Sequence, residues 1–457
     1  MFVRVAAVAG VLIVIALLIL SGRYVGVGEA MRFTDDLEHF KYGSIGAEVD
    51  GYPYKVWMAL PVIFKDRLPG GYESFGFHRE PSHTLPVGIS VRRYGIDRVG
   101  FNCATCHSTT VDGGAIIPGA PAVRLDLQAY VDFLLQASVD KRFDADAIFE
   151  ALSTLNEPLG LIDRLVYRWV IIPQIRRQAS SVIEDNSWMT TRPRFGPGRT
   201  DAGNPWRFRF GMHPKDDDTI ATVDFPSLWN QGIRQSAWLH WDGNNNSLQE
   251  RNLSAALAGG ARADSLDFKS IARVEDWSLN APPPLYPFDV DTALASRGAQ
   301  IYAGSGCIEC HDKGGASYGG TTPIAEVGTD RKRLDAFSNE LLRNFGSVGK
   351  GTPWQFSHYR KSDGYANSPL DGIWARAPYL HNGSVPNLYS LLAAPGARPA
   401  RFYRGCDEYN SEMVGFDCES GFLYDTAMPG NGNGGHEYGT TLPGSDKRAL
   451  LEYLKTL

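Results

Sequence analysis

The sequence has few cysteines, no run of basic residues and, beyond its first 20 residues, no long apolar run. Six cysteines in 457 residues exclude a small fold held together by disulfides. There are 45 Lys and Arg against 51 Asp and Glu, and this balance gives no indication of a nucleic-acid partner. A hydrophobic share of 43% excludes a disordered or collagen-like chain, and the length allows two or three domains.

The one long apolar run stands at the start of the chain. Residues 5–20 carry no charge, Arg4 precedes them and Arg23 follows. The run is short for a membrane span and long for the apolar part of a signal peptide, and both interpretations imply export. Because the cleavage site that ends at Ala30 is weak, we expect residues 1–24 to be a signal anchor in the inner membrane. The rest of the chain is then expected in the periplasm, an oxidising space.

Four of the six cysteines lie in two copies of the pattern Cys-x-x-Cys-His. The residues are Cys103, Cys106 and His107 in the first copy, and Cys307, Cys310 and His311 in the second. This pattern is the attachment signal of c-type haem. Two thiols on one helical turn reach the two vinyl groups of a porphyrin, and the adjacent histidine ligates the iron. A structural zinc site would need further ligands close by, so the sequence predicts two covalently bound haems.

The other two cysteines, Cys406 and Cys418, lie close together in a loop. In an oxidising compartment we expect them to form a local disulfide. Two free thiols or a metal pair are the alternatives.

A proline-rich segment separates the two haem motifs. Residues 281–287 contain four prolines and predict an extended linker. We therefore expect a catalytic haem domain at 25–280, a linker at 281–290 and an electron-transfer haem domain at 291–457. Helices are predicted at 126–143, 144–155, 291–303 and 446–455. The expected fold is mainly α, with two cytochrome-c-like haem domains, long irregular loops and no internal repeat beyond the haem motif.

Three further stretches carry recognisable motifs. They are residues 224–230 followed by 241–250, residues 370–385, and the glycine-rich residues 430–439. These stretches resemble the bacterial di-haem cytochrome c peroxidase superfamily, and most closely its rubber-oxygenase-like branch. The resemblance implies a di-haem oxidoreductase. It leaves the activity open, because the superfamily contains peroxidases, oxygenases and cofactor-maturing enzymes.

The resemblance implies a second ligand for the iron at His311. By similarity to the oxygenase branch this ligand is His436, and the alternatives are His381, Met413 and Met428. Two imidazoles generally give a lower potential than a histidine with a methionine. For His381 we expect a structural hydrogen bond.

The iron at His107 is expected to have an open distal side. The chain has no histidine between His107 and His213, where peroxidases of this superfamily often carry a removable ligand. Such a site binds hydrogen peroxide or dioxygen. The resemblance implies Glu250 as the base in peroxide cleavage and Trp229 as the relay between the haems. A solvated glutamate paired with Arg251, and ordinary packing of the tryptophan, are the alternatives.

Three other positions near these motifs are informative. Asn244 stands where the oxygenase branch has a bulky residue and the peroxidases have arginine, and His240 is expected to be packed or exposed rather than catalytic. Relatives hold calcium between the domains with a carbonyl near Pro378. A fixed positive charge at Arg376 argues against calcium here, so calcium is a doubtful cofactor.

Together these features predict a periplasmic di-haem c-type oxidoreductase that reduces hydrogen peroxide at the N-terminal haem. Electrons are expected from the C-terminal haem, and before it from a small redox protein or a membrane donor. The alternatives are a haem-dependent oxygenase of an apolar substrate and a membrane-tethered di-haem electron carrier. The three differ in the ligands that each iron carries.

Overall fold

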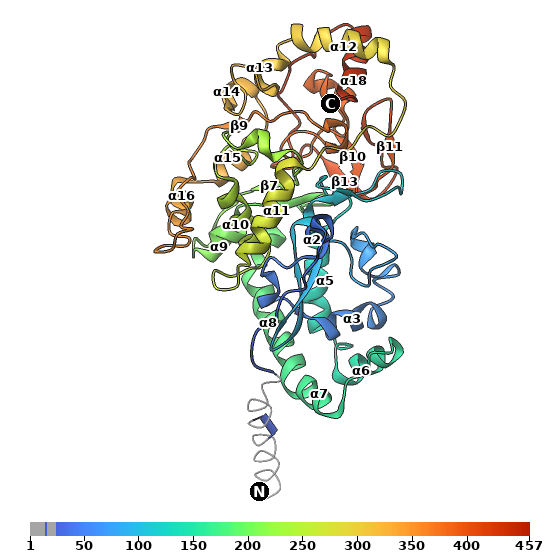
Figure 1. The fold of residues 1–457 in the computed structure, drawn as a ribbon, viewed down its shortest axis with the longest axis vertical. Helices are drawn as coiled ribbons and strands as arrows, with labels where there is room; N and C mark the ends of the chain where they lie inside the picture. The colour runs from blue at the N-terminus through green and yellow to red at the C-terminus, as the bar shows by residue number, and fades with distance from the viewer. Residues whose placement is uncertain (1–13, 16–23) are drawn as a thin grey trace, which may run out of the picture.

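The computed structural model describes residues 14–15 and 24–457. The predicted signal anchor at 1–24 therefore lies almost wholly outside the described residues. Within the described part of the chain, no helix is long and apolar enough to cross a bilayer. The helices α12 and α18 lie at one end of the molecule, and α6 and α7 lie at the other (Figure 1).

Helices provide most of the regular structure. The main ones are α2 (Asp36–Tyr42), α3 (Tyr54–Ile63), α5 (Leu127–Val139), α6 (Ala145–Thr154), α7 (Leu161–Val166), α8 (Ile172–Asp185), α9 (Asn204–Arg209), α10 (Leu248–Ala258), α11 (Phe268–Asn280), α12 (Thr292–Gly304), α15 (Lys332–Ala336), α16 (Asn339–Phe345) and α18 (Gly444–Leu454). Three of the predicted helices begin directly after an aspartate. The side chains of Asp126, Asp144 and Asp291 each accept a backbone N–H of the first turn, which satisfies a donor that has no partner inside the helix.

The strands are short and mostly paired in twos. They are β1 (Tyr52–Pro53), β2 (Ile89–Tyr94), β3 (Ile96–Phe101), β4 (Ser108–Thr109), β5 (Ile117–Pro118), β6 (Arg199–Asp201), β7 (Thr222–Asp224), β8 (Thr321–Pro323), β9 (Gly364–Ala366), β10 (Arg401–Arg404), β11 (Tyr409–Asn410), β12 (Gly415–Phe416) and β13 (Phe422–Asp425). The three-stranded sheet has the order β1-β3-β2, and Val91 lies opposite Val99 in its hairpin. This hairpin leads straight into the first haem motif.

The first haem motif is the short helix α4 (Cys103–Cys106) that follows β3. Asn102 lies between the two elements, and its side-chain oxygen accepts the N–H of Ala104 at 3.0 Å. Its side-chain nitrogen donates to the carbonyl of Lys41 in α2 at 3.0 Å. The sheet and α2 therefore fix the position of both cysteines.

The second haem motif, α13 (Cys307–His311), follows α12, which packs on the closing helix α18. The two helices approach closely at Gly298, where an added Cβ would lie 2.0 Å from the carbonyl oxygen of Ala449. Only glycine permits this contact. The C-terminal helix thus supports the helix that presents the second motif.

The structure contains an internal repeat that the sequence did not reveal. In the first copy the chain runs from β7 through η6 (Gln231–Arg234) to α10. In the second copy it runs from β9 through η7 (Ile373–Arg376) to α17 (Leu388–Leu391). Left-handed backbone angles recur at matching places. The pairs are Asn230 with Gly372, His240 with Leu380, and Gly243 with Gly383. The expectation of no internal repeat was wrong, because the two copies share backbone geometry more than residue types.

The two sides of the proline-rich segment share one core. Residues 281–287 carry no helix or strand. Trp206 in α9 and Leu253 in α10 nevertheless pack in one cluster with Leu341 and Phe345 of α16, and these helices lie side by side in Figure 1. Part of the chain beyond the linker therefore completes the core around α10.

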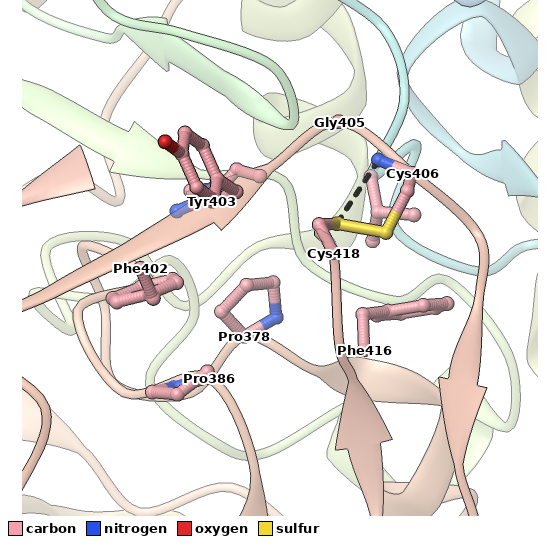
Figure 2. A pocket seen from close by; sticks show the side chains of 10 residues that line it. Pro378, Pro386, Phe402, Tyr403, Gly405, Cys406, Phe416 and Cys418 are labelled. Atoms are coloured by element: carbon pink, nitrogen blue, oxygen red, sulfur yellow. Dashed lines mark hydrogen bonds between the residues drawn. A yellow bond between two sulfur atoms is a disulfide. The ribbon is translucent and has the colours of Figure 1, made fainter. Parts of the chain in front are cut away.

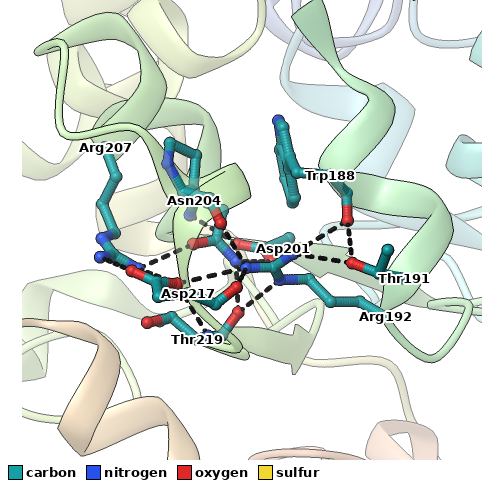
Figure 3. Close-up of polar contacts among 9 residues, drawn as sticks. Trp188, Thr191, Arg192, Asp201, Asn204, Arg207, Asp217 and Thr219 are labelled. Carbon is teal, nitrogen blue, oxygen red and sulfur yellow. Dashed lines mark hydrogen bonds and ion pairs between the residues drawn. The ribbon is translucent and has the colours of Figure 1, made fainter.

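The buried Arg192 joins two long loops through hydrogen bonds. Arg192, which follows α8, donates from Nε to the carbonyl of Thr219 at 2.8 Å and from Nη1 to that of Trp188 at 2.9 Å. Asp217 and Asn204 belong to the same group of polar contacts (Figure 3). The network joins the segment after α8 to the loop before β7.

Cys406 and Cys418 form a disulfide with their Cα atoms 5.6 Å apart. The bond lies beside Pro378, Pro386 and Phe416 (Figure 2). It joins the end of β10 to the segment before β13, which pairs with β10 in antiparallel fashion. The disulfide therefore holds together the two ends of the segment between Cys406 and Cys418.

Candidate haem sites

A cavity of about 240 Å³ lies beside the second haem motif. Cys307, Cys310 and His311 line one side, and His436 lines it from another segment. Both cysteines are outside any disulfide. Most other lining side chains are apolar: Val327, Leu370, Ile373, Leu388, Leu391, Leu392, Leu450 and Leu454. Two thiols, two imidazoles and an apolar wall are the groups that a covalently bound haem requires.

His311 is oriented for metal binding. Its Nδ1 lies 2.7 Å from the carbonyl oxygen of Ser368, so this nitrogen carries the proton and donates. The other ring nitrogen, Nε2, is left with a lone pair for a metal. Burial lowers the pKa of His311, which favours the neutral form that ligation needs.

His436 lies opposite His311 at the distance expected for two ligands of one metal. The ring centroids are 6.3 Å apart. Two metal–nitrogen bonds of about 2 Å and two ring radii of about 1.1 Å add to nearly the same separation. Burial is also the main cause that lowers the pKa of His436 to about 4. The residues present therefore fit an iron with two imidazole ligands.

The glycine-rich loop that carries His436 is held by backbone hydrogen bonds. The N–H of His436 donates to the carbonyl of Val327 at 2.6 Å, and Arg398 donates to the carbonyl of Gly435 at 2.8 Å. An added Cβ at Gly435 would lie 2.3 Å from backbone atoms of Gly328 and Val327, so the close approach requires glycine. Arg398 also donates to the carbonyl of His436 itself.

The other candidate ligands of this iron are placed differently. His381 lines the cavity, but its ring stacks on Tyr365 with centroids 4.1 Å apart, and its Nε2 lies 2.9 Å from the tyrosine hydroxyl. Met428 is 44% exposed, and neither it nor Met413 is among the lining residues. His436 is thus the candidate that faces His311 across the cavity.

The first haem motif repeats the arrangement of the second. The Nδ1 of His107 lies 2.7 Å from the carbonyl oxygen of Pro226, so Nε2 is again left for a metal. Pro226 and Ser368 each stand two residues after the strands β7 and β9 of the internal repeat. Burial lowers the pKa of His107 to about 4, and the two thiols of this motif are half-buried and outside any disulfide. The residues present fit a second covalent haem.

The repeat relates the wall of the cavity at His311 to residues near the first haem motif. Ile373, Leu391 and Leu392 line that cavity. Ile373 begins η7 as Gln231 begins η6, and Leu391 and Leu392 stand three and four residues after the start of α17, as Arg251 and Asn252 do after the start of α10. Three apolar positions of the second copy are therefore polar in the first.

Arg251 is the charged member of this polar group. Its Nη1 donates to Oε1 of Gln231 at 2.5 Å, and Gln231 is only 1% exposed. Burial lowers the pKa of Arg251 to about 10. Burial raises the pKa of Cys103 and lowers that of His107, and the positive charge of Arg251 opposes the first shift and adds to the second. The guanidinium therefore lies close to the first haem motif. The prediction from sequence missed this role, which only an alignment of the two repeat copies would have revealed.

Glu250 is buried and fully engaged. It is 5% exposed, and its Oε1 accepts from the N–H of Ser357 at 2.7 Å and lies 2.7 Å from Nδ1 of His358. Its Oε2 accepts from Asn245 at 3.1 Å. The glutamate is therefore neither solvated nor paired with Arg251. Its role as a proton acceptor stays a prediction.

Trp229 lies between the segments that carry the two motifs. Its indole N–H donates to the carbonyl of Asp371 at 2.9 Å, and an added Cβ at Gly372 would lie 2.8 Å from its ring. On the other side an added Cβ at Gly119 would lie 3.4 Å from the indole, and the N–H of Gly119 donates to the carbonyl of His107 at 2.8 Å. The side chain is 1% exposed. The indole is thus in contact with both haem-carrying regions.

The remaining predicted positions are engaged in hydrogen bonds. Asn244 is 1% exposed, and its Oδ1 lies 2.7 Å from Nδ1 of the half-buried His240. Arg376 donates to the carbonyl of Pro369 at 2.7 Å and to the carbonyl and carboxylate of Asp371. Its guanidinium thus places a fixed positive charge beside these oxygen atoms, and calcium stays a doubtful cofactor.

Comparison with known proteins relates the chain to haem proteins. Residues 364–403, which contain η7 and His381, match the family model described as RoxA-like, cytochrome c-like. Two uncharacterized proteins of Sinorhizobium fredii (strain NBRC 101917 / NGR234) are similar in sequence. The protein y4iM is 28% identical over 54% of this chain and 68% of its own length, and y4iJ is 26% identical over 85% and 82%. These similarities indicate a haem-binding redox protein with a cytochrome c-like domain.

Proposed function

We propose that the chain is a periplasmic oxidoreductase with two cytochrome-c-like haem domains, which reduces hydrogen peroxide at the haem of His107. The electrons come from the haem of His311. The observation that carries the proposal is the contrast between the surroundings of the two motifs. His436 faces His311 across an apolar cavity, whereas Arg251 and Gln231, near His107, stand at the positions that Leu391 and Ile373 hold in the wall of that cavity.

The haem irons, once bound, supply the redox chemistry and, at the first site, a coordination position for an oxygen ligand. His107 and His311 present Nε2 because their Nδ1 atoms donate to carbonyl oxygens. His436 closes the opposite side of the second site. That site is then suited to electron transfer, since no position remains for a substrate.

Arg251 supplies a fixed positive charge at the first site. Reduction of peroxide takes two electrons and two protons and yields two waters, and negative charge develops on the oxygen atoms. A cation held in place in a half-buried site stabilises such charge, because the dielectric constant there is lower than in water. Gln231 accepts one N–H of Arg251 and so holds the guanidinium in place.

Glu250 and His358 offer a route for the protons. The side chain of His358 is 53% exposed, whereas that of Glu250 is 7% exposed, and the two are hydrogen-bonded. A proton taken up by the imidazole at the surface can pass to the buried carboxylate. Trp229, which contacts both haem-carrying regions, provides the corresponding route for electrons.

The test is the anaerobic addition of hydrogen peroxide to the fully reduced protein. One equivalent of peroxide accepts two electrons, so it is expected to oxidise both haems of one molecule, followed by absorption spectroscopy. Glu250→Gln is expected to slow this oxidation, and Glu309→Gln, an exposed glutamate in the second motif, serves as the matched control. Reduced protein that stays reduced after peroxide is added would contradict the proposal.

A second function is an oxygenase of an apolar substrate. It is favoured by the match to the RoxA-like family model, and opposed by the polar Arg251 and Gln231 near His107. Incorporation of labelled dioxygen into an unsaturated hydrocarbon, without consumption of peroxide, would support it. If neither peroxide nor dioxygen reacts and both irons are saturated with protein ligands, the chain is an electron carrier.

A further inference from the structure

The helix that runs from α7 through η3 (Tyr167–Ile171) into α8 exposes apolar side chains on one face. Leu161, Leu165 and Trp169 follow one another at intervals of four residues and are 82%, 49% and 67% exposed. Ile162 and Val170 beside them are 46% and 38% exposed. We call these five residues the α7 apolar face. Single exposed apolar side chains are ordinary, but a contiguous group on one helix face marks an interaction site.

The opposite face of the same helix packs on the core. Tyr167, Ile172 and Ile175 are buried in the cluster that contains α3, α5 and α6. The helix is therefore held rigidly by its inner face. The α7 apolar face is consequently a fixed surface of the folded protein rather than a mobile loop.

The start of the chain lies beside this surface. The hydroxyl of Tyr24 donates to Oδ1 of Asp163 in α7. Val25 and Val27, which come next in the chain, are 57% and 60% exposed. The apolar run at residues 5–20 ends only a few residues before Tyr24. Tyr24, which stands at the end of the predicted anchor, is thus bonded to the helix that carries the α7 apolar face.

Basic side chains border the apolar ones. Arg164 and Arg177 are exposed on α7 and α8. A helix with leucine and tryptophan on one face and arginine at its border is typical of segments that lie in the headgroup region of a membrane. Tryptophan prefers this region because its ring is apolar and its N–H is polar, and arginine attracts anionic lipids.

We propose that the α7 apolar face rests on the surface of a bilayer that contains anionic phospholipids. The contact holds the soluble part of the chain in one orientation, with α12 and α18 farthest from the membrane (Figure 1). The cavity at His311, which Leu450 and Leu454 of α18 help to line, then faces away from the lipid. A soluble electron donor can reach it there. The inference does not depend on the reaction proposed above.

The test uses the full-length holoprotein in vesicles of phosphatidylethanolamine and phosphatidylglycerol. A nitroxide spin label is attached at Leu165→Cys, and in a second variant at Ser296→Cys, an exposed position on α12 at the other end of the molecule. Collisions with oxygen, which dissolves in lipid, are compared with collisions with a water-soluble nickel chelate. The label at 165 is expected to meet oxygen but lose contact with nickel, and the label at 296 to do the reverse.

The outcomes separate lipid from other occupants. Equal access of the nickel chelate to both labels would overturn the proposal. Protection of the label at 165 from the nickel chelate without vesicles, together with magnetic coupling between the labels of two molecules, would also overturn the proposal. It would show that a second copy of this chain covers the α7 apolar face. Adding Trp169→Asp to the variant labelled at 165 is expected to restore nickel access. Because the substituted side chains are exposed, each variant is expected to fold. An unchanged haem absorption spectrum checks this.

Discussion

His381→Gln tests how the buried histidines couple acidity to stability. Burial, together with the charges of Arg333 and Arg199, lowers the pKa of His381 from 6.5 to about 3. In the unfolded chain this imidazole binds a proton below about pH 6.5, whereas in the folded protein it stays neutral. The stability that it confers is therefore present above pH 6.5 and is lost as the pH falls towards 3. At pH 5 the difference is about 1.5 pKa units, and at about 1.36 kcal/mol per unit the loss is about 2 kcal/mol.

The assay is urea unfolding of the holoprotein at pH 7 and pH 5. The wild type is expected to lose about 2 kcal/mol more than His381→Gln between these values, because glutamine does not titrate but can still form a hydrogen bond with the hydroxyl of Tyr365. His213→Asn is the control, since His213 is exposed and its left-handed φ of 48° suits asparagine. Equal losses in wild type and His381→Gln would refute the reasoning. A change of haem spectrum in His381→Gln would show that His381 ligates an iron.

Three further variants test the site. His436→Ala is expected to convert the second haem from low spin to high spin, and added imidazole to restore the original spectrum; an unchanged spectrum would exclude His436 as the ligand. Arg251→Leu is expected to weaken fluoride binding at the first haem about 10- to 100-fold, because a hydrogen bond to a charged group contributes about 1.5–3 kcal/mol. Arg251→Lys should retain part of this affinity. Equal fluoride affinities of the wild type and Arg251→Leu would contradict the placement of this charge. Trp229→Phe is expected to slow oxidation of the second haem after peroxide is added, measured by stopped flow, while both resting spectra stay the same; an unchanged rate would remove the indole from the electron route.

The elements that follow strong local signals could be predicted from the sequence. Asp126, Asp144 and Asp291 mark helix starts because a carboxylate caps the first turn. The haem motifs could also be predicted from neighbouring residues alone, because both thiols and the imidazole must lie on one helical turn. The glycine-rich loop could be recognised by its resemblance to a known family, and His436 within it lies opposite His311.

The surroundings of the first haem could not be predicted, because they depend on contacts between distant segments. Glu250 is engaged by Ser357 and His358, more than 100 residues later in the chain. The role of Arg251 became visible only when its position was compared with Leu391 in the second copy of the repeat. Side chains of different chemistry at equivalent backbone positions leave little trace in a single sequence.

The proposed function requires two irons with different ligands. Electron paramagnetic resonance of the oxidised, as-isolated holoprotein distinguishes them, because spin state reports the number of strong ligands on each iron. We expect one low-spin signal from a haem between His311 and His436 and one high-spin signal from a haem at His107. Two low-spin signals, with no high-spin component in either the oxidised or the half-reduced protein, would contradict it.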